Sequence, residues 1–128
     1  MDAFNTHGAF SWSELTTTDT QGAARFYTAL FNWGTREMEM PNGTYTTFQV
    51  GESSVGGMLK TPPGVPPVPS WGCYVTVTDI DATCKQATEL GGKVMVEPFD
   101  IPTVGRMAIL QDPQGAMISV ITYVAPAT

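Results

Sequence analysis

The chain of 128 residues and 13.7 kDa suits one domain with an ordinary hydrophobic core, or two fused modules of half that size. Hydrophobic residues make up 42% of the chain and charged residues 14%, so we expect a folded protein rather than a disordered one. Twelve acidic and six basic side chains give a net charge of -6. This charge disfavours nucleic acids and anionic membrane surfaces as partners.

The cellular compartment is inferred from two sequence features that would indicate a membrane protein or a secreted one. No apolar run approaches the roughly 18 residues that span a bilayer, and the start MDAFNTHGAF lacks the basic and apolar stretches of a secretion signal. We therefore expect a soluble cytoplasmic protein. Two cysteines, Cys73 and Cys84, are too few for a disulfide framework, and we expect both to be buried free thiols.

An internal repeat organises the chain. An alternating stretch precedes both Asp19 and Asp79, and a helical pattern follows each; 79 minus 19 gives an offset of 60 residues, which also relates Leu30 to Leu90. Each copy continues through three more short segments of strand character. The sequence therefore predicts an α+β fold of two βαβββ modules.

The module boundaries follow from a proline-rich segment. TPPGVPPVPS, residues 61–70, contains five prolines, which remove amide donors and favour an extended polyproline geometry. We interpret it as a stiff spacer rather than as a ligand for another domain. The first module then occupies residues 1–60 and the second residues 71–128, in one domain overall.

Both modules offer recognisable strand and helix signals in chain order. In the first, the helix follows the N-cap Asp19, carries an apolar stripe that should cover a sheet face, and stops at Gly34. In the second, the helix runs from about Ile80 to Leu90. The apolar stripe of the first helix comprises Ala23, Phe26, Tyr27, Leu30 and Phe31, and the strands are expected near 9–17, 35–40, 44–50, 54–60, 71–78, 93–97, 104–111 and 115–123.

Strand alternation assigns the faces of the two sheets, because residues two apart share a side. Cys73, Val75 and Val77 should pack beneath the second helix, which turns Tyr74 and Thr76 to the other face. By the repeat offset, Trp12, Glu14 and Thr16 occupy the matching face of the first copy, while Ser13, Leu15 and Thr17 point toward the helix. Bulky aromatics, hydroxyls and one carboxylate are typical of a ligand pocket.

Two motifs carry a family resemblance. The run DTQGAARFYTALFNW resembles the aspartate-then-Phe-Tyr helix of the vicinal-oxygen-chelate superfamily, and DPQGAMISV is similar to its turn into the last strand. That superfamily includes glyoxalase I, extradiol dioxygenases, methylmalonyl-CoA epimerase and bleomycin-binding resistance proteins, and its members pair βαβββ modules. The likeness covers residues 9–123. It implies that the two sheets form a curved, open barrel around a cavity, and it is strongest to small bacterial glyoxalase-like proteins.

The resemblance also implies where a divalent metal would be held. The first histidine position falls on Trp12, the second on Gly72 or Trp71, and the glutamate positions fall on Ser119 and near Leu59. None of these residues is a strong ligand for zinc or iron, and His7 is the sole histidine of the chain. We therefore expect neither a metal nor another cofactor.

The remaining candidates each have a functional and a purely structural interpretation. Glu14 is the candidate catalytic residue: beside Trp12 its carboxylate would be desolvated and its pKa raised into the range of a general base. Alternatively it is hydrogen-bonded to a buried hydroxyl or paired with Arg106. Trp12 and Tyr74 could stack on a flat ligand or simply fill a closed cavity.

The candidate ligand-binding residues of the second module lie on its inner strand faces. They are Tyr74, Thr76, Met117, Ser119 and Ile121. Ser119 could orient a ligand or only relieve crowding. Arg106 could clamp a carboxylate or phosphate, or form an ordinary surface ion pair. The Gly56-Gly57 pair is expected to mark a bulge or a close backbone approach rather than a cofactor site.

These patterns lead to one expected function and two alternatives. The expected function is a metal-free, glyoxalase-like protein, acting as a homodimer, that captures a small and partly apolar organic molecule between its modules. The first alternative is a metal-independent lyase or isomerase in which Glu14 transfers a proton. The second is a subunit of a larger complex with no ligand of its own.

Overall fold

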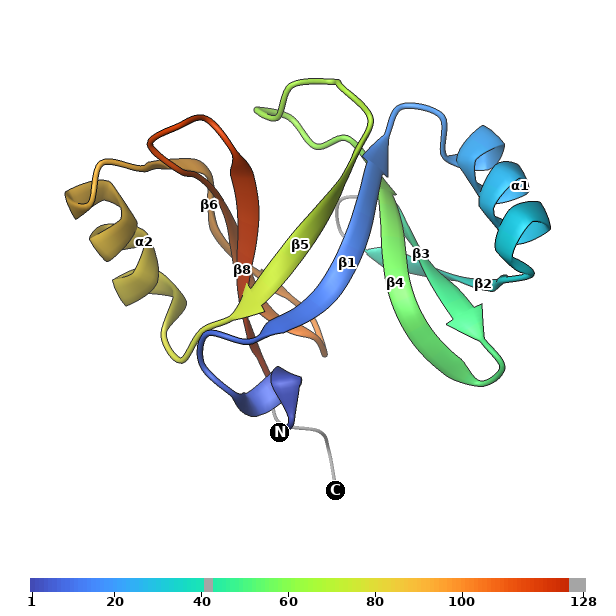
Figure 1. The fold of residues 1–128 in the computed structure, drawn as a ribbon, viewed down its shortest axis with the longest axis horizontal. Coiled ribbons are helices and arrows are strands. Elements are labelled where there is room, and N and C mark those ends of the chain that lie inside the picture. The colour runs from blue at the N-terminus through green and yellow to red at the C-terminus, as the bar shows by residue number, and fades with distance from the viewer. Residues whose placement is uncertain (41–42, 125–128) are drawn as a thin grey trace. The chain divides into compact units, whose positions relative to one another are not determined.

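The structure, a computed structural model, describes residues 1–40 and 43–124. The chain forms two compact units, one of residues 12–72 and one of residues 1–11 together with the chain from residue 73. Each unit has a four-stranded sheet with a helix against one face (Figure 1). The expected α+β class with two βαβββ modules is confirmed.

The first unit builds its sheet around a parallel pair. Its strand order is β2-β3-β4-β1, in which β1 and β4 are parallel and the other neighbours antiparallel. The elements are β1 (Phe10–Thr17), α1 (Thr20–Phe31), β2 (Gly34–Met40), β3 (Gly43–Val50) and β4 (Ser53–Lys60). They lie within two residues of the expected ranges. The proline-rich residues 61–69 that follow form no helix or strand.

Helix α1 begins and ends by specific capping contacts. The Asp19 side chain accepts a 2.9 Å hydrogen bond from the Gly22 amide, as expected of an N-cap. The helix ends earlier than expected: Asn32, not Gly34, takes the left-handed conformation that closes it, with φ of 59°. An asparagine tolerates this conformation because its short polar side chain can compensate locally.

The apolar stripe of α1 divides between two sides of the helix. Ala23 and Tyr27 pack, as expected, against a buried core of Leu15, Phe48 and Met58. The expectation that Phe26, Leu30 and Phe31 cover the sheet is wrong, because their side chains are 59%, 58% and 53% exposed. At 100° per residue, Phe26 and Leu30 share a side of the helix that the core does not reach.

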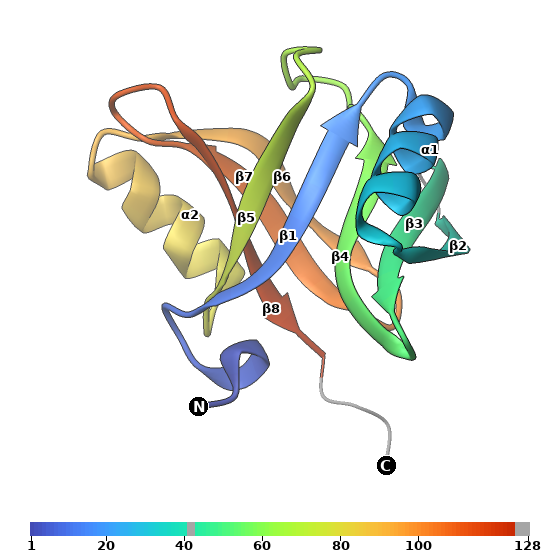
Figure 2. The same ribbon diagram turned by 45° about the vertical axis from the view of Figure 1, so that its right-hand side comes forward.

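The second unit repeats this plan. Its strand order is β5-β8-β7-β6, with β5 and β8 parallel, and its helix lies across one face of the sheet (Figure 2). The elements are β5 (Ser70–Thr76), α2 (Ile80–Glu89), β6 (Lys93–Ile101), β7 (Gly105–Gln111) and β8 (Met117–Tyr123). Ile80 and Cys84 of α2 are buried against Val77, Ala108, Leu110 and Val120. This core holds α2 against the sheet although Thr83, Gln86 and Thr88 interrupt the apolar stripe of the helix.

Two expectations for the second unit are corrected. Strand β6 continues past residue 97 to Ile101, because it is an edge strand whose register shifts twice, and Pro98 lies in the second shift. Proline is tolerated at such edges and bulges. Cys73 is exposed rather than buried beneath α2, whereas Val75 and Val77 do belong to that core. Both cysteines are free thiols, as expected.

The N-terminal segment packs on the second unit. After a short 3-10 helix, η1 (Ala3–Asn5), the Gly8 amide donates to the Thr76 carbonyl and the Thr76 amide donates to the Ala9 carbonyl, both at 2.8 Å. The Phe4 ring meets the edge of Tyr123 at 4.9 Å. Among residues 1–40 and 43–124, no helix has the length and apolar character needed to cross a membrane.

Candidate functional site

The face of the first sheet opposite α1 carries the candidate residues of β1. Leu15 belongs to the core beneath α1, as expected. Alternation along β1 therefore places Trp12, Glu14 and Thr16 on the other face. Glu14 is only 7% exposed, and a buried carboxylate requires polar partners.

A tyrosine supplies a partner. The Tyr45 hydroxyl of β3 donates a 2.7 Å hydrogen bond to Glu14 Oε2 and accepts a 2.8 Å hydrogen bond from Trp12 Nε1. One phenol thereby links the two candidate residues of β1. Glu14 thus has a hydroxyl partner, as in one of its structural interpretations, and the contact also fixes the direction of its carboxylate.

Gly57 makes room for this contact. It lies on β4, between the strands of Tyr45 and Glu14, and is the register partner of Glu14. A Cβ atom at Gly57 would lie 1.9 Å from the Tyr45 hydroxyl oxygen and 2.4 Å from the ring carbon that bears it. The close backbone approach expected at the Gly56-Gly57 pair is found at Gly56, where a Cβ atom would lie 3.0 Å from the Ser13 carbonyl oxygen. At Gly57 the approaching group is instead the Tyr45 phenol, a side chain.

A second polar group lies farther along the same face of β3. Gln49 Nε2 donates to Thr47 Oγ1 at 2.7 Å and to Ser54 Oγ at 2.8 Å. The Thr47 hydroxyl is itself the donor to the Arg36 carbonyl, so it accepts from the amide nitrogen, which fixes the amide orientation. Gln49 Oε1 is then a buried acceptor without a partner among the described residues.

In the second unit, the candidate residues share the face opposite α2. Tyr74 is paired in register with Ser119, and Thr76 with Ile121; alternation along β8 adds Met117. The Tyr74 hydroxyl donates to the Met107 sulfur at 3.4 Å. The Thr76 hydroxyl donates to the Ala3 carbonyl at 2.6 Å, so the N-terminal segment engages this candidate group.

Arg106 lies apart from these residues. It points toward α2, where Nε and Nη2 contact the two oxygens of Asp81 at 3.1 and 3.0 Å, and Nη1 lies 3.4 Å from Asp100. The hydrogen bonds that Arg106 donates to Asp81 lower the pKa of Asp81 below its ordinary value and raise the pKa of Arg106. The structure therefore shows the ion pair that was the alternative to a ligand clamp.

His7 also has a structural contact. Its Nδ1 accepts a 3.0 Å hydrogen bond from the Thr78 amide and lies 3.2 Å from the Thr78 hydroxyl. Because Nδ1 acts as an acceptor here, the ring carries its proton on Nε2. His7 thus ties the N-terminal segment to the start of α2.

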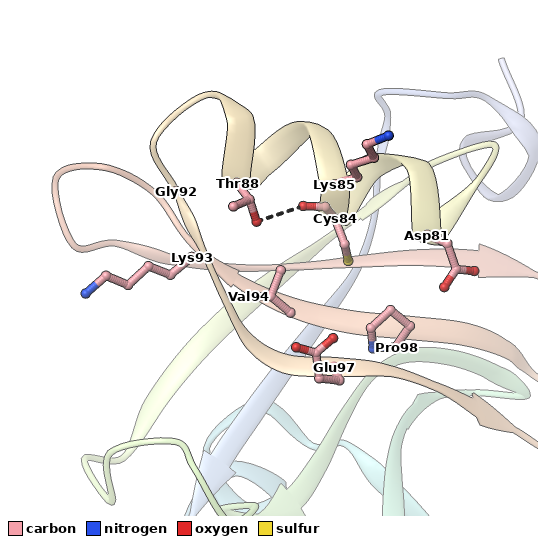
Figure 3. A pocket seen from close by; sticks show the side chains of 9 residues that line it. All are labelled: Asp81, Cys84, Lys85, Thr88, Gly92, Lys93, Val94, Glu97 and Pro98. Atoms are coloured by element: carbon pink, nitrogen blue, oxygen red, sulfur yellow. Dashed lines mark hydrogen bonds between the residues drawn. The ribbon is translucent and has the colours of Figure 1, made fainter.

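A shallow depression of about 620 Å³ opens between α2 and β6 (Figure 3). Its lining includes Cys84, Val94 and Glu97, and the side chains of Lys85 and Lys93 extend away from the sulfur. Burial raises the pKa of the Cys84 thiol, which keeps it protonated and poorly nucleophilic. The depression therefore offers no activated nucleophile.

The residues present do not fit the divalent metal that the fold family implies. The four implied positions carry an indole, a glycine, an aliphatic and a hydroxyl side chain at Trp12, Gly72, Leu59 and Ser119. Among residues 1–40 and 43–124, no group of three or more His, Cys, Asp or Glu side chains could hold a metal ion. Such a donor set lacks the imidazole and carboxylate ligands that zinc and iron sites require.

Sequence reasoning missed the residues that organise Glu14. Tyr45 was not singled out, although it alternates with Thr47 on a strand that was expected, and Gly57 was identified only as a place of close approach. Tyr45 and Gly57 meet Glu14 because of the register in which β3, β4 and β1 pair. A single sequence does not reveal this register. No sequence pattern singled out Gln49.

Comparison with known proteins extends these observations. The chain is 43% identical over 119 residues to CFP32 of Mycobacterium tuberculosis (strain CDC 1551 / Oshkosh), which carries a provisional glyoxylase name; the match covers 91% of this chain and 45% of that protein. It is 34% identical over 129 residues to the anthracycline biosynthesis protein DauV of Streptomyces sp. (strain C5), covering 88% and 46%. The chain thus spans about half the length of these curated relatives.

Solved structures of low sequence identity share the fold. Methylmalonyl-CoA epimerase from Mycobacterium tuberculosis matches with a TM-score of 0.60 at 14% identity, over 97% of this chain and 92% of that one. A variant of homoprotocatechuate 2,3-dioxygenase from B. fuscum matches with a TM-score of 0.62 at 17% identity, over 93% and 33%. In sequence, residues 9–120 match the profile of the Glyoxalase/Bleomycin resistance protein/Dioxygenase superfamily. The chain belongs to this superfamily.

Proposed function

We propose that the chain binds a small, partly apolar organic ligand without a metal ion, and that it acts as a homodimer in the cytoplasm. Trp12 and Tyr74 would supply aromatic surface, while Glu14 and Ser119 would orient polar groups of the ligand. The observation that carries this proposal is the hydrogen-bonded chain from Trp12 through Tyr45 to Glu14. A carboxylate held in one direction suits the recognition of a ligand hydroxyl or amine.

The other residues on the two sheet faces support a role in recognition. Met117 would provide apolar contact area, whereas Ile121 and Thr76 are buried and the Thr76 hydroxyl would have to leave the Ala3 carbonyl to reach a ligand. Arg106 enters the proposal only as a residue that would have to leave its pair with Asp81 to reach a ligand. The buried acceptor of Gln49 adds a place for a ligand donor or a water molecule.

The relatives suggest a probe. DauV is named for anthracycline biosynthesis, and an anthracycline is a flat aromatic molecule with several hydroxyl groups. The test is a fluorescence titration of the purified protein with an anthracycline. We expect saturable binding in the micromolar range, weakened about tenfold by Trp12→Leu, a loss of roughly 1.4 kcal/mol.

The matched control is Trp71→Leu. Trp71 belongs to the same unit but contacts Tyr27 and Trp33 on the α1 side of the sheet. This variant should leave the affinity unchanged. Equal weakening by both variants, or no saturable binding, would refute a binding role for Trp12 toward this class of ligand.

The competing function is a metal-independent lyase or isomerase that uses Glu14 as the proton-transfer base. It is favoured by the buried position of the Glu14 carboxylate and by the Tyr45 hydroxyl at 2.7 Å. The discriminating variant is Glu14→Gln, tested with the hemithioacetal of methylglyoxal and a small thiol. Retained affinity with lost turnover would establish the enzyme, whereas absence of turnover in the wild type supports the binder.

A further inference from the structure

Helix α1 presents apolar side chains on two sides. Its inner side packs on the core through Ala23, Ala24 and Tyr27. Its outer side exposes Phe26 and Leu30, one turn apart, and Phe31 lies next to Leu30. A surface helix normally turns its apolar side chains toward the core and polar ones toward solvent. In the isolated chain, α1 is covered on one side only.

The exposed side chains form one continuous surface through Tyr27. The Tyr27 ring lies 5.0 Å from Phe26, 6.2 Å from Phe31 and 5.3 Å from Trp71, centroid to centroid. Trp71 is itself 42% exposed and donates its indole hydrogen to the Tyr27 hydroxyl at 3.1 Å. We call the surface formed by Phe26, Leu30, Phe31 and Trp71 the α1 aromatic face.

The size of this surface is that of an interaction site. Large apolar side chains that are about half exposed offer roughly 100 Å² each, so four of them expose about 400 Å². The largest apolar patch on a typical monomer covers about 300–600 Å² and is often functional. A standard interface buries about 800 Å² per partner, with an apolar core inside a polar rim. The α1 aromatic face would supply such a core.

The distribution of charge favours a second copy of this chain as the partner. The chain has a net charge of -6, so two copies repel each other over most of their surfaces. Helix α1 contains no acidic residue, and its single charged residue is Arg25. Two copies that meet through α1 therefore bring together helices that carry no carboxylate between Thr20 and Phe31. A symmetric dimer also needs a self-complementary patch, which an apolar one provides.

Helix α2 of the second unit serves as a comparison for the outer side of α1. By the repeat offset of 79 minus 19, or 60 residues, Phe26 corresponds to Gln86 and Ala29 to Glu89, and both residues of α2 are exposed. At these two positions the outer side of α2 is polar where that of α1 is apolar, whereas Leu30 and its counterpart Leu90 are both exposed apolar residues. The difference lies in the outer side chains and not in the architecture.

We infer that the α1 aromatic face is the homodimer interface, seating α1 of one copy against α1 of a second. This inference rests on the homodimer proposed above and specifies its surface. It is independent of the ligand, because the α1 aromatic face lies on the opposite side of the sheet from Trp12 and Glu14.

The test transfers the outer residues of α2 to α1. The double variant Phe26→Gln/Ala29→Glu changes only exposed positions outside the buried core, so its circular dichroism spectrum should match that of the wild type. Sedimentation velocity at micromolar concentrations should show a dimeric wild type. Each substitution acts twice in a symmetric interface, so we expect the dimer Kd to rise by at least about 100-fold.

The control and the contrary outcomes separate the two proposals. Leu90→Gln removes an exposed apolar residue next to α2, 71% exposed, and should leave the dimer intact. A wild type that remains monomeric overturns both the homodimer and its surface. A folded double variant that remains dimeric, or a Leu90→Gln variant that dissociates equally, keeps the homodimer and overturns the α1 aromatic face. Ligand titrations are not needed for any of these outcomes.

Discussion

Tyr45 reaches across Gly57 to hold Glu14. The phenol starts on β3, crosses β4 where that strand has no side chain, and donates to the carboxylate on β1 at 2.7 Å. Three strands therefore cooperate in one contact. The orientation of Glu14 depends on the register of the whole half-sheet and not only on its own strand.

Removing the Tyr45 hydroxyl should weaken the first unit. In Tyr45→Phe, the buried Glu14 carboxylate and the Trp12 indole both lose this partner, and we expect a loss of about 1–3 kcal/mol in the free energy of unfolding. Urea denaturation measures the loss. Tyr27→Phe is the control, because its hydroxyl bonds the exposed Trp71, so that variant should cost less than about 1 kcal/mol. Equal losses would contradict the special role of Tyr45.

A side chain at Gly57 should act through Tyr45. In Gly57→Ala, the new methyl group would occupy the space of the phenol, and we expect a destabilisation of about 1–3 kcal/mol. In a Tyr45→Leu background the same substitution should cost much less, because the competing atoms are gone. A double-mutant cycle measures this coupling. An additive result would show that Gly57 is required for some other reason.

The two cysteines should react at very different rates. Cys73 is exposed, whereas Cys84 is buried and its thiol pKa is raised by burial. The thiolate is the reactive form. Ellman's reagent should therefore titrate one thiol quickly in the native protein and the second only after unfolding. Cys73→Ser should abolish the fast phase, and a fast phase that survives in this variant would place Cys84 at the surface.

The Asp81–Arg106 pair should make stability depend on pH at the acidic end. Arg106 lowers the pKa of Asp81 in the folded state, so the contribution of the pair is complete above the unfolded pKa of an aspartate, about 3.9. It is lost as the pH falls through the lower folded pKa. Asp81→Asn should therefore lower the melting temperature at neutral pH, and the difference from wild type should shrink as the pH falls below about 4.

The measurement for this pair is a series of thermal melts from neutral to acidic pH. Both side chains are substantially exposed, so the effect should be small and should weaken with added salt. The control is Asp2→Asn, which changes an aspartate that caps the N-terminal 3-10 helix instead. A difference for Asp81→Asn that grows toward acidic pH would contradict the assigned sign.

The fold could be predicted from the sequence because its signals are local and repeated. The N-caps Asp19 and Asp79 mark both helices, and the turn residues separate strands that lie close to their expected bounds. The errors arose where a neighbouring strand or helix decides the outcome. Pro98 was expected to lie past the end of a strand, but it lies on an edge with shifted register.

The contacts of the candidate site were harder to predict from the sequence than the fold, because they also depend on neighbouring strands. Glu14 and Trp12 follow from alternation along one strand, but their partner Tyr45 comes from a strand two places away in the sheet. Arg106 shows the converse: alternation along β7 places it on the α2 side with Ala108 and Leu110, but it does not reveal that Asp81 in the first turn of α2 pairs with it. Contacts between distant segments require the register, which a single sequence does not contain.

The parallel pairing of first and last strands also sets an order of events during folding. Glu14 meets Gly57 and Tyr74 meets Ser119, so each pairing closes a loop of more than 40 residues, from 57 minus 14 and 119 minus 74. The antiparallel hairpins join neighbours in the chain and close much shorter loops. Loop closure over long separations slows folding. We therefore expect the hairpins to form first and β1 and β5 to dock last, so that the strands carrying Glu14 and Tyr74 acquire amide protection after the hairpins do.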